Sequence, residues 1–274
     1  MLLPFEDVYA RLVVRGRHDR GYQTVPLARI VGSQGRHLDF DRFFLPRTDR
    51  GAERWKQIRC AHYQERDLPP VELYKLGDIY FVADGNHRVS EARERGQVTI
   101  NAYVTEFEVD VPLSPELDPG DLSGKEEQSD FFAWTDLVRL RPGCDIEASA
   151  PGGYLDLIAH INRYRRRLEA EHPSRFSRDE AIVHWYDQVY GPTVAAIDQM
   201  RLPAVLRRRS AADLYVAVAN HQLSMAAETG QTADINAAVR DYLRQLSWRM
   251  RWMRAWRSML SHLPTSIVGR RKPS

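Results

Sequence analysis

The fold of the first part of the chain is decided by the stretch Tyr80-Phe81-Val82-Ala83-Asp84-Gly85-Asn86-His87-Arg88-Val89-Ser90-Glu91-Ala92-Arg93. Its apolar beginning predicts a strand that runs into Asp84 and Gly85. Because Gly readily takes the positive φ of a tight turn, we expect the chain to turn there and to begin a helix near His87. Gly96 is typical of the residue that ends such a helix.

This strand, turn and helix are the leading candidate for a phosphate site. The first backbone N–H groups of a helix have no partner inside the helix, so they attract anions. Arg88 could add a bidentate guanidinium contact, and His87 could act as a donor or a proton shuttle. A purely structural alternative has comparable weight: Asp84 and Asn86 cap the helix, while His87 and Arg88 pair with carboxylates of a neighbouring loop.

Outward from this stretch, the chain divides into two parts of different character. Strands are expected at 24–31, 78–84 and 98–109, and helices at 51–63 and 87–95, which indicates a mixed α/β domain over residues 1–107. Residues 108–130 carry eight acidic residues against one lysine, with several Pro and Gly, and are interpreted as an acidic linker. Residues 131–274 are expected to be helical, with helices near 151–169, 177–200, 210–228 and 233–263. The expected fold class is α+β.

The turn also resembles a known family. The run Asp84–Arg88, with Leu68-Pro69-Pro70-Val71 before it and Ile100–Val104 after it, resembles the N-terminal domain of the ParB and sulfiredoxin superfamily. The resemblance implies that Gly85 and Arg88 hold the phosphates of a nucleotide, CTP in ParB proteins and ATP in sulfiredoxin, with Mg²⁺. His87 matches the His of the sulfiredoxin-type turn. Asn86 stands where sulfiredoxin has its catalytic cysteine, so reduction of a sulfinic acid is not expected.

The wider chain is similar to uncharacterised bacterial ParB-like proteins that join this domain to a helical region. The residues that carry this similarity are Ile30-Val31-Gly32-Ser33, Gly35-Arg36, Asp39-Phe40-Asp41, Trp185-Tyr186-Asp187, Val189-Tyr190, Pro192 and Ala212-Asp213-Leu214-Tyr215. Arg36 could reach the same ligand as the Asp84–Arg88 turn. Asp39 and Asp41 could hold a Mg²⁺ that accompanies a nucleotide, but a solvated helix cap explains two carboxylates equally well, and no metal site is predicted.

Several residues of the helical part have an ordinary structural reading. His160, His184 and His221 lie on expected helices, and Asp187 follows His184 by three residues, but no second pair of ligands has matching spacing. The helical spacing of Trp185, Tyr186, Val189 and Tyr190 predicts core packing, with a base-stacking platform as the minor alternative. Ser210 is expected to cap a helix, with Asp213 as its first-turn acid.

Composition excludes some classes of protein and conceals an uneven charge. The 274 residues, 43% of them hydrophobic, have a net charge of +2 and no apolar run long enough to span a membrane, and the two cysteines give no disulfide framework. A cytoplasmic protein is expected. Of 39 basic residues 35 are arginine, and nine basic residues lie between 240 and 272 beside Asp241 alone. Trp248, Trp252 and Trp256 recur there every four residues, which favours core or homodimer packing over nucleic acid, and nucleic acid over a membrane surface.

Three functions follow from these observations. The leading one is binding of a nucleotide or another phosphate ligand at Asp84, Gly85, Asn86, His87 and Arg88. Any weak hydrolysis there would need a general base, for which His87 is the best candidate. The first alternative is a DNA-binding transcriptional regulator or partition-like protein that uses the arginine-rich helices. The second is a ParB-like nuclease or kinase, which would require a metal bound by carboxylates near the turn.

Overall fold

The structure is a computed structural model that describes residues 2–45, 47, 69–199, 209–229 and 237–246. The chain forms two compact units, Met1–Asp145 and Ile146–Ser274. The expected helix at 51–63, the tryptophan stripe from Trp248 to Trp256 and the proposed dimer contact built on it lie outside the described residues.

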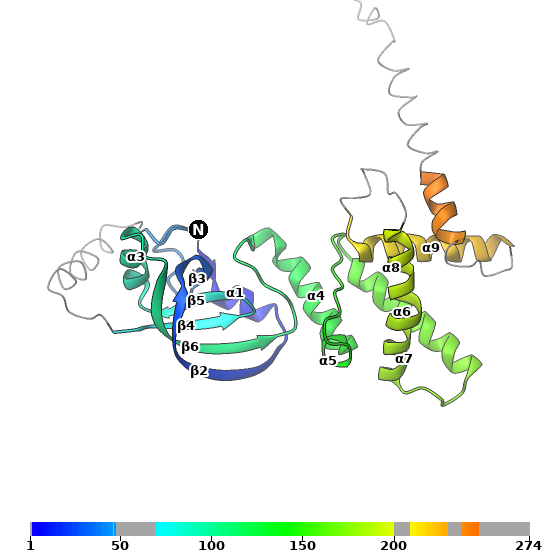
Figure 1. Ribbon diagram of the computed structural model, residues 1–274, viewed down its shortest axis with the longest axis horizontal. Coiled ribbons are helices and arrows are strands. Elements are labelled where there is room, and N and C mark those ends of the chain that lie inside the picture. The colour runs from blue at the N-terminus through cyan, green and yellow to red at the C-terminus, as the bar shows by residue number, and fades with distance from the viewer. Residues whose placement is uncertain (1, 46, 48–68, 200–208, 230–236, 247–274) are drawn as a thin grey trace, which may run out of the picture. The chain divides into compact units, whose positions relative to one another are not determined.

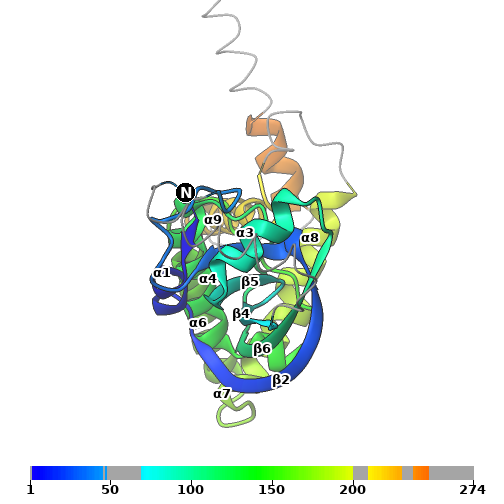
Figure 2. The ribbon, with the colours of Figure 1, turned by 90° about the vertical axis from the view of Figure 1, so that its left-hand side faces the viewer.

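The first unit is built on a mixed sheet with the strand order β1-β3-β5-β4-β6-β2. The strands are β1 (Leu3–Pro4), β2 (Val14–Pro26), β3 (Ile30–Ser33), β4 (Val71–Leu76), β5 (Ile79–Asp84) and β6 (Thr99–Val109). β4 and β5 form a tight antiparallel hairpin, and β2 pairs antiparallel with β6, whereas β1 with β3, β3 with β5 and β4 with β6 run parallel. Figure 2 shows β2 as a wide arc around this sheet.

Four helices complete the described part of the first unit: α1 (Phe5–Ala10), α3 (Asn86–Glu94), α4 (Leu122–Thr135) and α5 (Leu137–Leu140). The helix α3 packs against β4 and β6. Its Val89 joins Val71, Leu73 and Val82 in one fully buried cluster, to which Phe40 and Phe44 contribute from the segment after β3. This apolar contact fixes the end of α3 that carries the predicted phosphate turn.

The acidic segment 108–130 carries the end of β6 and most of α4 instead of an extended linker. Its charges are directed to basic residues of the same unit: Arg15 Nε lies 2.7 Å from Asp110, and Arg11 lies 2.5 Å from Glu126. The apolar residues between the acids are buried, namely Val111, Leu113, Leu122, Phe131 and Phe132. The boundary between the two units along the chain therefore falls between Asp145 and Ile146, and not within residues 108–130.

The described residues of the second unit form helices and connecting turns, without a strand. The helices are α6 (Gly153–Glu171), α7 (Arg178–Trp185), a π-helical turn (Tyr186–Tyr190), α8 (Gly191–Asp198), α9 (Ala211–Thr229) and a further helix at 237–246 (Figure 1). Ile197, Leu214, Val218, Ala238 and Val239 form a buried cluster of this unit. The sheet of the first unit and the helices of the second make the chain an α+β protein, as predicted.

Among the described residues, no helix has both the length and the apolar character needed to cross a membrane.

Candidate ligand site at the start of helix α3

Gly85 makes the turn between β5 and α3, and no other residue fits there without strain. Its φ is +103°, in the region that L side chains rarely adopt. A Cβ at this position would lie 2.6 Å from Val71 Cγ1 and 3.0 Å from Arg88 Cζ. The prediction that Gly85 begins the helix by a positive-φ turn is therefore confirmed.

The first turn of α3 starts from a glycine at the N-cap position. Gly85 occupies the N-cap position and has no side chain that could make a capping hydrogen bond. The alternative in which Asp84 or Asn86 caps α3 is therefore wrong. The first intrahelical bond is donated by the Val89 N–H to the Gly85 carbonyl, so the N–H groups of Asn86, His87 and Arg88 precede the regular ladder.

Arg88 is held in place by three acceptors. One terminal nitrogen donates to the carbonyl oxygens of Pro69 and Pro70, at 2.5 and 2.7 Å, and the other donates to the Asp84 carboxylate. The Arg88 side chain is only 15% exposed, whereas that of Asp84 is 68% exposed. A guanidinium carries five N–H donors, so these contacts orient Arg88 without using all its capacity.

Asn86 and His87 point into the protein rather than into solvent. Each is only 4% exposed, and the His87 ring packs edge to face on Phe40 with ring centroids 5.2 Å apart. The side-chain oxygen of Asn86 is buried and has no hydrogen-bond partner within the described residues. Most buried polar atoms are hydrogen-bonded, so this oxygen is an exception in the described part of the chain.

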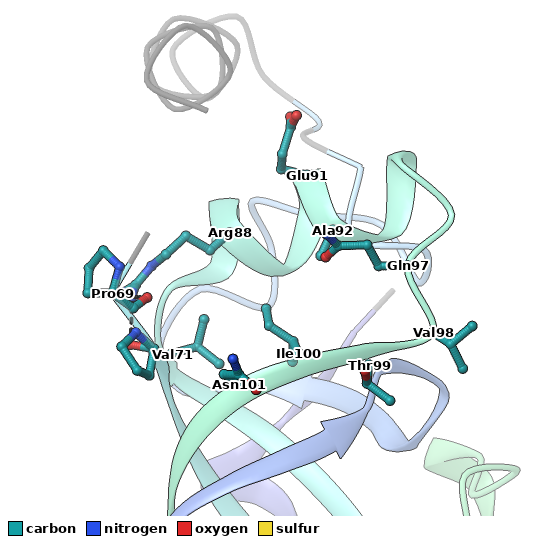
Figure 3. Close-up of a pocket in the computed structure, with 11 residues that line it drawn as sticks. Pro69, Val71, Arg88, Glu91, Ala92, Gln97, Val98, Thr99, Ile100 and Asn101 are labelled. Carbon is teal, nitrogen blue, oxygen red and sulfur yellow. Dashed lines mark hydrogen bonds between the residues drawn. The ribbon is translucent and has the colours of Figure 1, made fainter. Parts of the chain in front are cut away.

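A cavity of about 460 Å³ lies beside α3 (Figure 3). Arg88 and Ala92 form its helical side, and the strand β6 closes it from below with Ile100. Its full lining comprises Pro69, Pro70, Val71, Arg88, Glu91, Ala92, Gln97, Val98, Thr99, Ile100 and Asn101. The volume falls within the range of about 300 to 1,000 Å³ that is typical of small-molecule sites. Neither Asn86 nor His87 belongs to this lining.

Arg36 and the two aspartates after it have structural partners. Arg36 Nε donates to Asp39 at 2.9 Å, and its guanidinium lies over the Phe40 ring that also contacts His87. Asp41 accepts the N–H groups of Phe43 and Leu45 through one carboxylate oxygen. In the described ranges, no group of three or more His, Cys, Asp or Glu residues could hold a metal ion.

The candidate residues of the second unit are placed apart from one another. Each histidine has its own partner: His160 bonds Asn220, His184 bonds the Tyr164 hydroxyl, and His221 bonds Asp241, at distances of 3.0, 2.6 and 2.9 Å. The predicted packing of the aromatic group is confirmed for Trp185 and Tyr190, which are buried.

The Trp185 indole N–H donates to the Tyr215 hydroxyl at 2.9 Å. Burial raises the pKa of Tyr215 to about 12, so this hydroxyl stays protonated at neutral pH.

Comparison with known proteins adds one sequence family and two structural neighbours. Residues 154–246 match the family model described as Domain of unknown function (DUF4032). No curated protein matches the chain.

The structural neighbours are proteins of the kind that the turn resembles. Sulfiredoxin from Arabidopsis thaliana is 20% identical with a TM-score of 0.22, covering 30% of this chain and 82% of its own. A Pnob8-like ParB-N domain is 12% identical with a TM-score of 0.22, covering 85% of this chain and 98% of its own. At these TM-scores we interpret the site from the residues of this chain alone.

Sequence reasoning missed the far wall of the cavity. The five consecutive residues from Gln97 to Asn101, after α3 and at the start of β6, all border it. No periodic pattern marks them, because successive residues of a strand point to opposite faces. Pro69 and Pro70, which also border the cavity, are separated from β6 in the sequence by the β4–β5 hairpin and α3.

Proposed function

We propose that the first unit is a ParB-like module that binds a nucleotide or another phosphate-bearing small molecule at the start of α3. A phosphate would contact Arg88 and the first N–H groups of α3, and the remainder of the ligand would occupy the adjacent cavity. The observation that carries this proposal is the positive-φ turn at Gly85 followed by Arg88, whose side chain lies on the wall of a cavity of about 460 Å³. The resemblance at Gly85 and Arg88 supports CTP or ATP, with Mg²⁺, as the ligand class.

Asp84 is the internal competitor for that phosphate. Its exposed carboxylate occupies one terminal nitrogen of Arg88, while the other nitrogen is anchored to Pro69 and Pro70. A ligand phosphate could replace Asp84 without disturbing the anchored side of the guanidinium. Arginine and phosphate have matching bidentate geometry, so the exchange would keep Arg88 paired.

We propose binding of the ligand without its hydrolysis. His87, the best candidate base in the sequence of the turn, is buried against Phe40 and does not line the cavity. A general base must lie within hydrogen-bond reach of the proton that it removes. His87 would have to leave the apolar cluster to meet this condition.

Thermal-shift titration of the full chain tests the proposal, with CTP, ATP, GTP and pyrophosphate, each with and without Mg²⁺. A ligand that binds only the folded state raises the Tm, and the increase grows with the logarithm of the ligand concentration above the Kd. We expect Asp84→Asn to increase the shift at a given ligand concentration and Arg88→Ala to abolish it.

The matched control is Arg29→Ala, because Arg29 is a half-exposed arginine of the same unit with only a long ion pair of 3.8 Å to Asp78. Arg88→Ala also removes the bonds to Pro69 and Pro70, so each variant is compared with its own Tm without ligand. No shift in the wild type with any of the four ligands, or an equal shift in Arg88→Ala, would contradict the proposal.

DNA binding by the arginine-rich helices is the second candidate. Arg163, Arg165 and Arg166 of α6 have no carboxylate partner within the described residues, which leaves their charge available. Binding through phosphates should weaken steeply with salt. Fluorescence anisotropy with duplex DNA between 50 and about 200 mM KCl measures this dependence, and affinity that does not change with salt would exclude the DNA hypothesis.

A further inference from the structure

The arginines of α6 are divided between two faces of the helix. Asn162, Arg165, Arg166 and Glu169 are spaced by three or four residues and share one face, whereas Arg163 and Arg167 lie on the next face with Tyr164. The first group lines a cavity next to α7, and the second lines a different cavity next to α9. The two faces can therefore be changed independently.

The cavity between α6 and α7 has a volume of about 430 Å³. Three arginines border it: Arg165 and Arg166 from α6, and Arg178 from the start of α7. Its complete lining is Asn162, Arg165, Arg166, Leu168, Glu169, Phe176, Ser177, Arg178 and Ala181. Phe176, Leu168 and Ala181 add apolar surface to this lining, and ligand sites commonly combine apolar surface with a few polar groups.

The charge of Arg165 and Arg166 is not neutralised inside the described part of the unit. Arg165 donates to the Asn162 side-chain oxygen at 3.2 Å, and Arg166 donates to the Asn162 carbonyl at 3.3 Å. The acceptor is neutral in both contacts, so neither contact compensates the positive charge of the guanidinium group. Arg178, in contrast, lies 3.4 Å from the Asp179 carboxylate.

Glu169, the acidic residue of the lining, is engaged elsewhere. One of its carboxylate oxygens accepts the Ser174 N–H at 3.0 Å, which ties it to the loop between the helices. The start of α7 is also satisfied by its own side chains, because Ser177 and Glu180 form a reciprocal capping box. An anion in this cavity would therefore be held by the guanidinium groups and not by the helix end.

We propose that the cavity between α6 and α7 binds the phosphate group of a small phosphorylated organic molecule. Arg165 and Arg166 would grip the phosphate oxygens in the bidentate manner that guanidinium groups favour, and Phe176 would cover the organic part. A single inorganic anion would leave most of a 430 Å³ cavity unfilled, which favours a ligand with a carbon skeleton. This site is separate from Arg88 and does not depend on the function proposed for the first unit.

The test is isothermal titration of the full chain with pyrophosphate and with phenyl phosphate. We expect the double variant Arg165→Ala/Arg166→Ala to weaken this binding by at least about tenfold, because two charge-assisted contacts are lost. The matched control is Arg167→Ala, which removes an arginine of the same helix from the other face and should change affinity less than about twofold. The double variant Arg165→Lys/Arg166→Lys keeps the charge but loses the planar fork, so an intermediate affinity is expected.

The same titrations in an Arg88→Ala chain separate this site from the one at α3. Binding that persists in Arg88→Ala and disappears in Arg165→Ala/Arg166→Ala supports the α6–α7 site, whatever becomes of the first proposal. Binding that disappears in Arg88→Ala and persists in the α6 double variant would overturn this inference and leave the α3 site standing. Absence of binding in every chain would overturn this inference, whereas the α3 site is judged by the nucleotide titrations. Phenyl phosphate that binds no tighter than pyrophosphate would contradict an organic ligand.

Discussion

Asp213 joins the start of α9 to the loop that precedes α6. Its N–H donates to the Ser210 hydroxyl at 3.1 Å, which confirms Ser210 as the cap of this helix. Its carboxylate accepts the N–H groups of Ser149 and Ala150, at 3.1 and 3.2 Å, and also the Ser149 hydroxyl. Burial acts to raise the pKa of Asp213, but these hydrogen bonds outweigh it and hold the pKa below its ordinary value.

The lowered pKa of Asp213 predicts an acid-sensitive second unit. Because the folded carboxyl binds a proton less readily than the unfolded one, its stabilisation is complete above the unfolded pKa and is lost as pH falls through the folded pKa. Asp213→Asn should lower the free energy of unfolding at pH 7 by about 2 to 3 kcal/mol, as expected for hydrogen bonds to a charged group.

Urea unfolding of Asp213→Asn followed between pH 7 and about pH 2 should also show a shallower decline than the wild type. Asp156→Asn is the matched control, since Asp156 is an exposed first-turn acid of α6. An unchanged pH profile in Asp213→Asn would show that the carboxylate does not carry this sensitivity.

Single residues also show how far the sequence allowed the site to be predicted. The turn at Gly85 followed from the conformational freedom of glycine and is confirmed by its φ of +103°. The carbonyl partners of Arg88 and the burial of His87 could not be foreseen. They depend on Pro69, Pro70 and Phe40, whose distance from α3 is set by the sheet and not by local spacing.

At the scale of elements, the two ends of α3 offer a controlled comparison. Gly85 and Gly96 both have positive φ, at +103° and +70°, but a Cβ at Gly96 would have no atom within 4 Å, whereas at Gly85 it would meet Val71. Gly96→Ala should cost about 1 kcal/mol of unfolding free energy through backbone strain alone. Gly85→Ala should cost about 2 to 4 kcal/mol, because steric overlap adds to that strain. Chemical denaturation monitored by circular dichroism measures the free energy of unfolding of both variants. Equal losses would mean that the Val71 side chain moves aside without an energetic cost.

Elements differed in how well the sequence predicted them. The strands at 78–84 and 98–109 and the helix at 87–95 agree closely with β5, β6 and α3. Residues 24–31 were expected to form one strand, but they form the end of β2, a 3-10 turn at Leu27–Arg29 and the start of β3. Most of β2 was missed because its exposed and charged side chains lack the apolar alternation that marks a half-buried strand.

The single helix expected at 177–200 is divided by a π-helical turn at Tyr186–Tyr190. Pro192 follows this turn at the start of α8, where its missing N–H removes a regular backbone hydrogen bond. The Thr193 hydroxyl donates to the Val189 carbonyl at 2.6 Å and so satisfies an acceptor near the break. Trp185 and Tyr190, one just before this turn and one at its end, are both buried, with their ring centroids 5.3 Å apart.

At the scale of the whole molecule, two compact units with separate buried clusters predict two unfolding transitions. Gly85→Ala should lower the midpoint of one transition, and Asp213→Asn should lower the midpoint of the other. Each substitution should leave the transition of the other unit unchanged. Differential scanning calorimetry of the wild type and both variants measures this. Fragments 1–145 and 146–274 should retain the two transitions separately, and a single cooperative transition shifted by both substitutions would contradict the prediction.

The place of β2 at the rim of the described sheet has a consequence for how copies of the chain behave at high concentration. A long strand with open backbone donors and acceptors is a template for uncontrolled stacking into fibrils. Here β2 carries many charged side chains, with Arg15 paired to Asp110 and Arg20 paired to Glu106, and register shifts near Gly16 and Gly21 make the strand irregular. A second β2 brought alongside would have to remove water from these charged pairs and would meet a mismatched ladder, so such stacking is disfavoured.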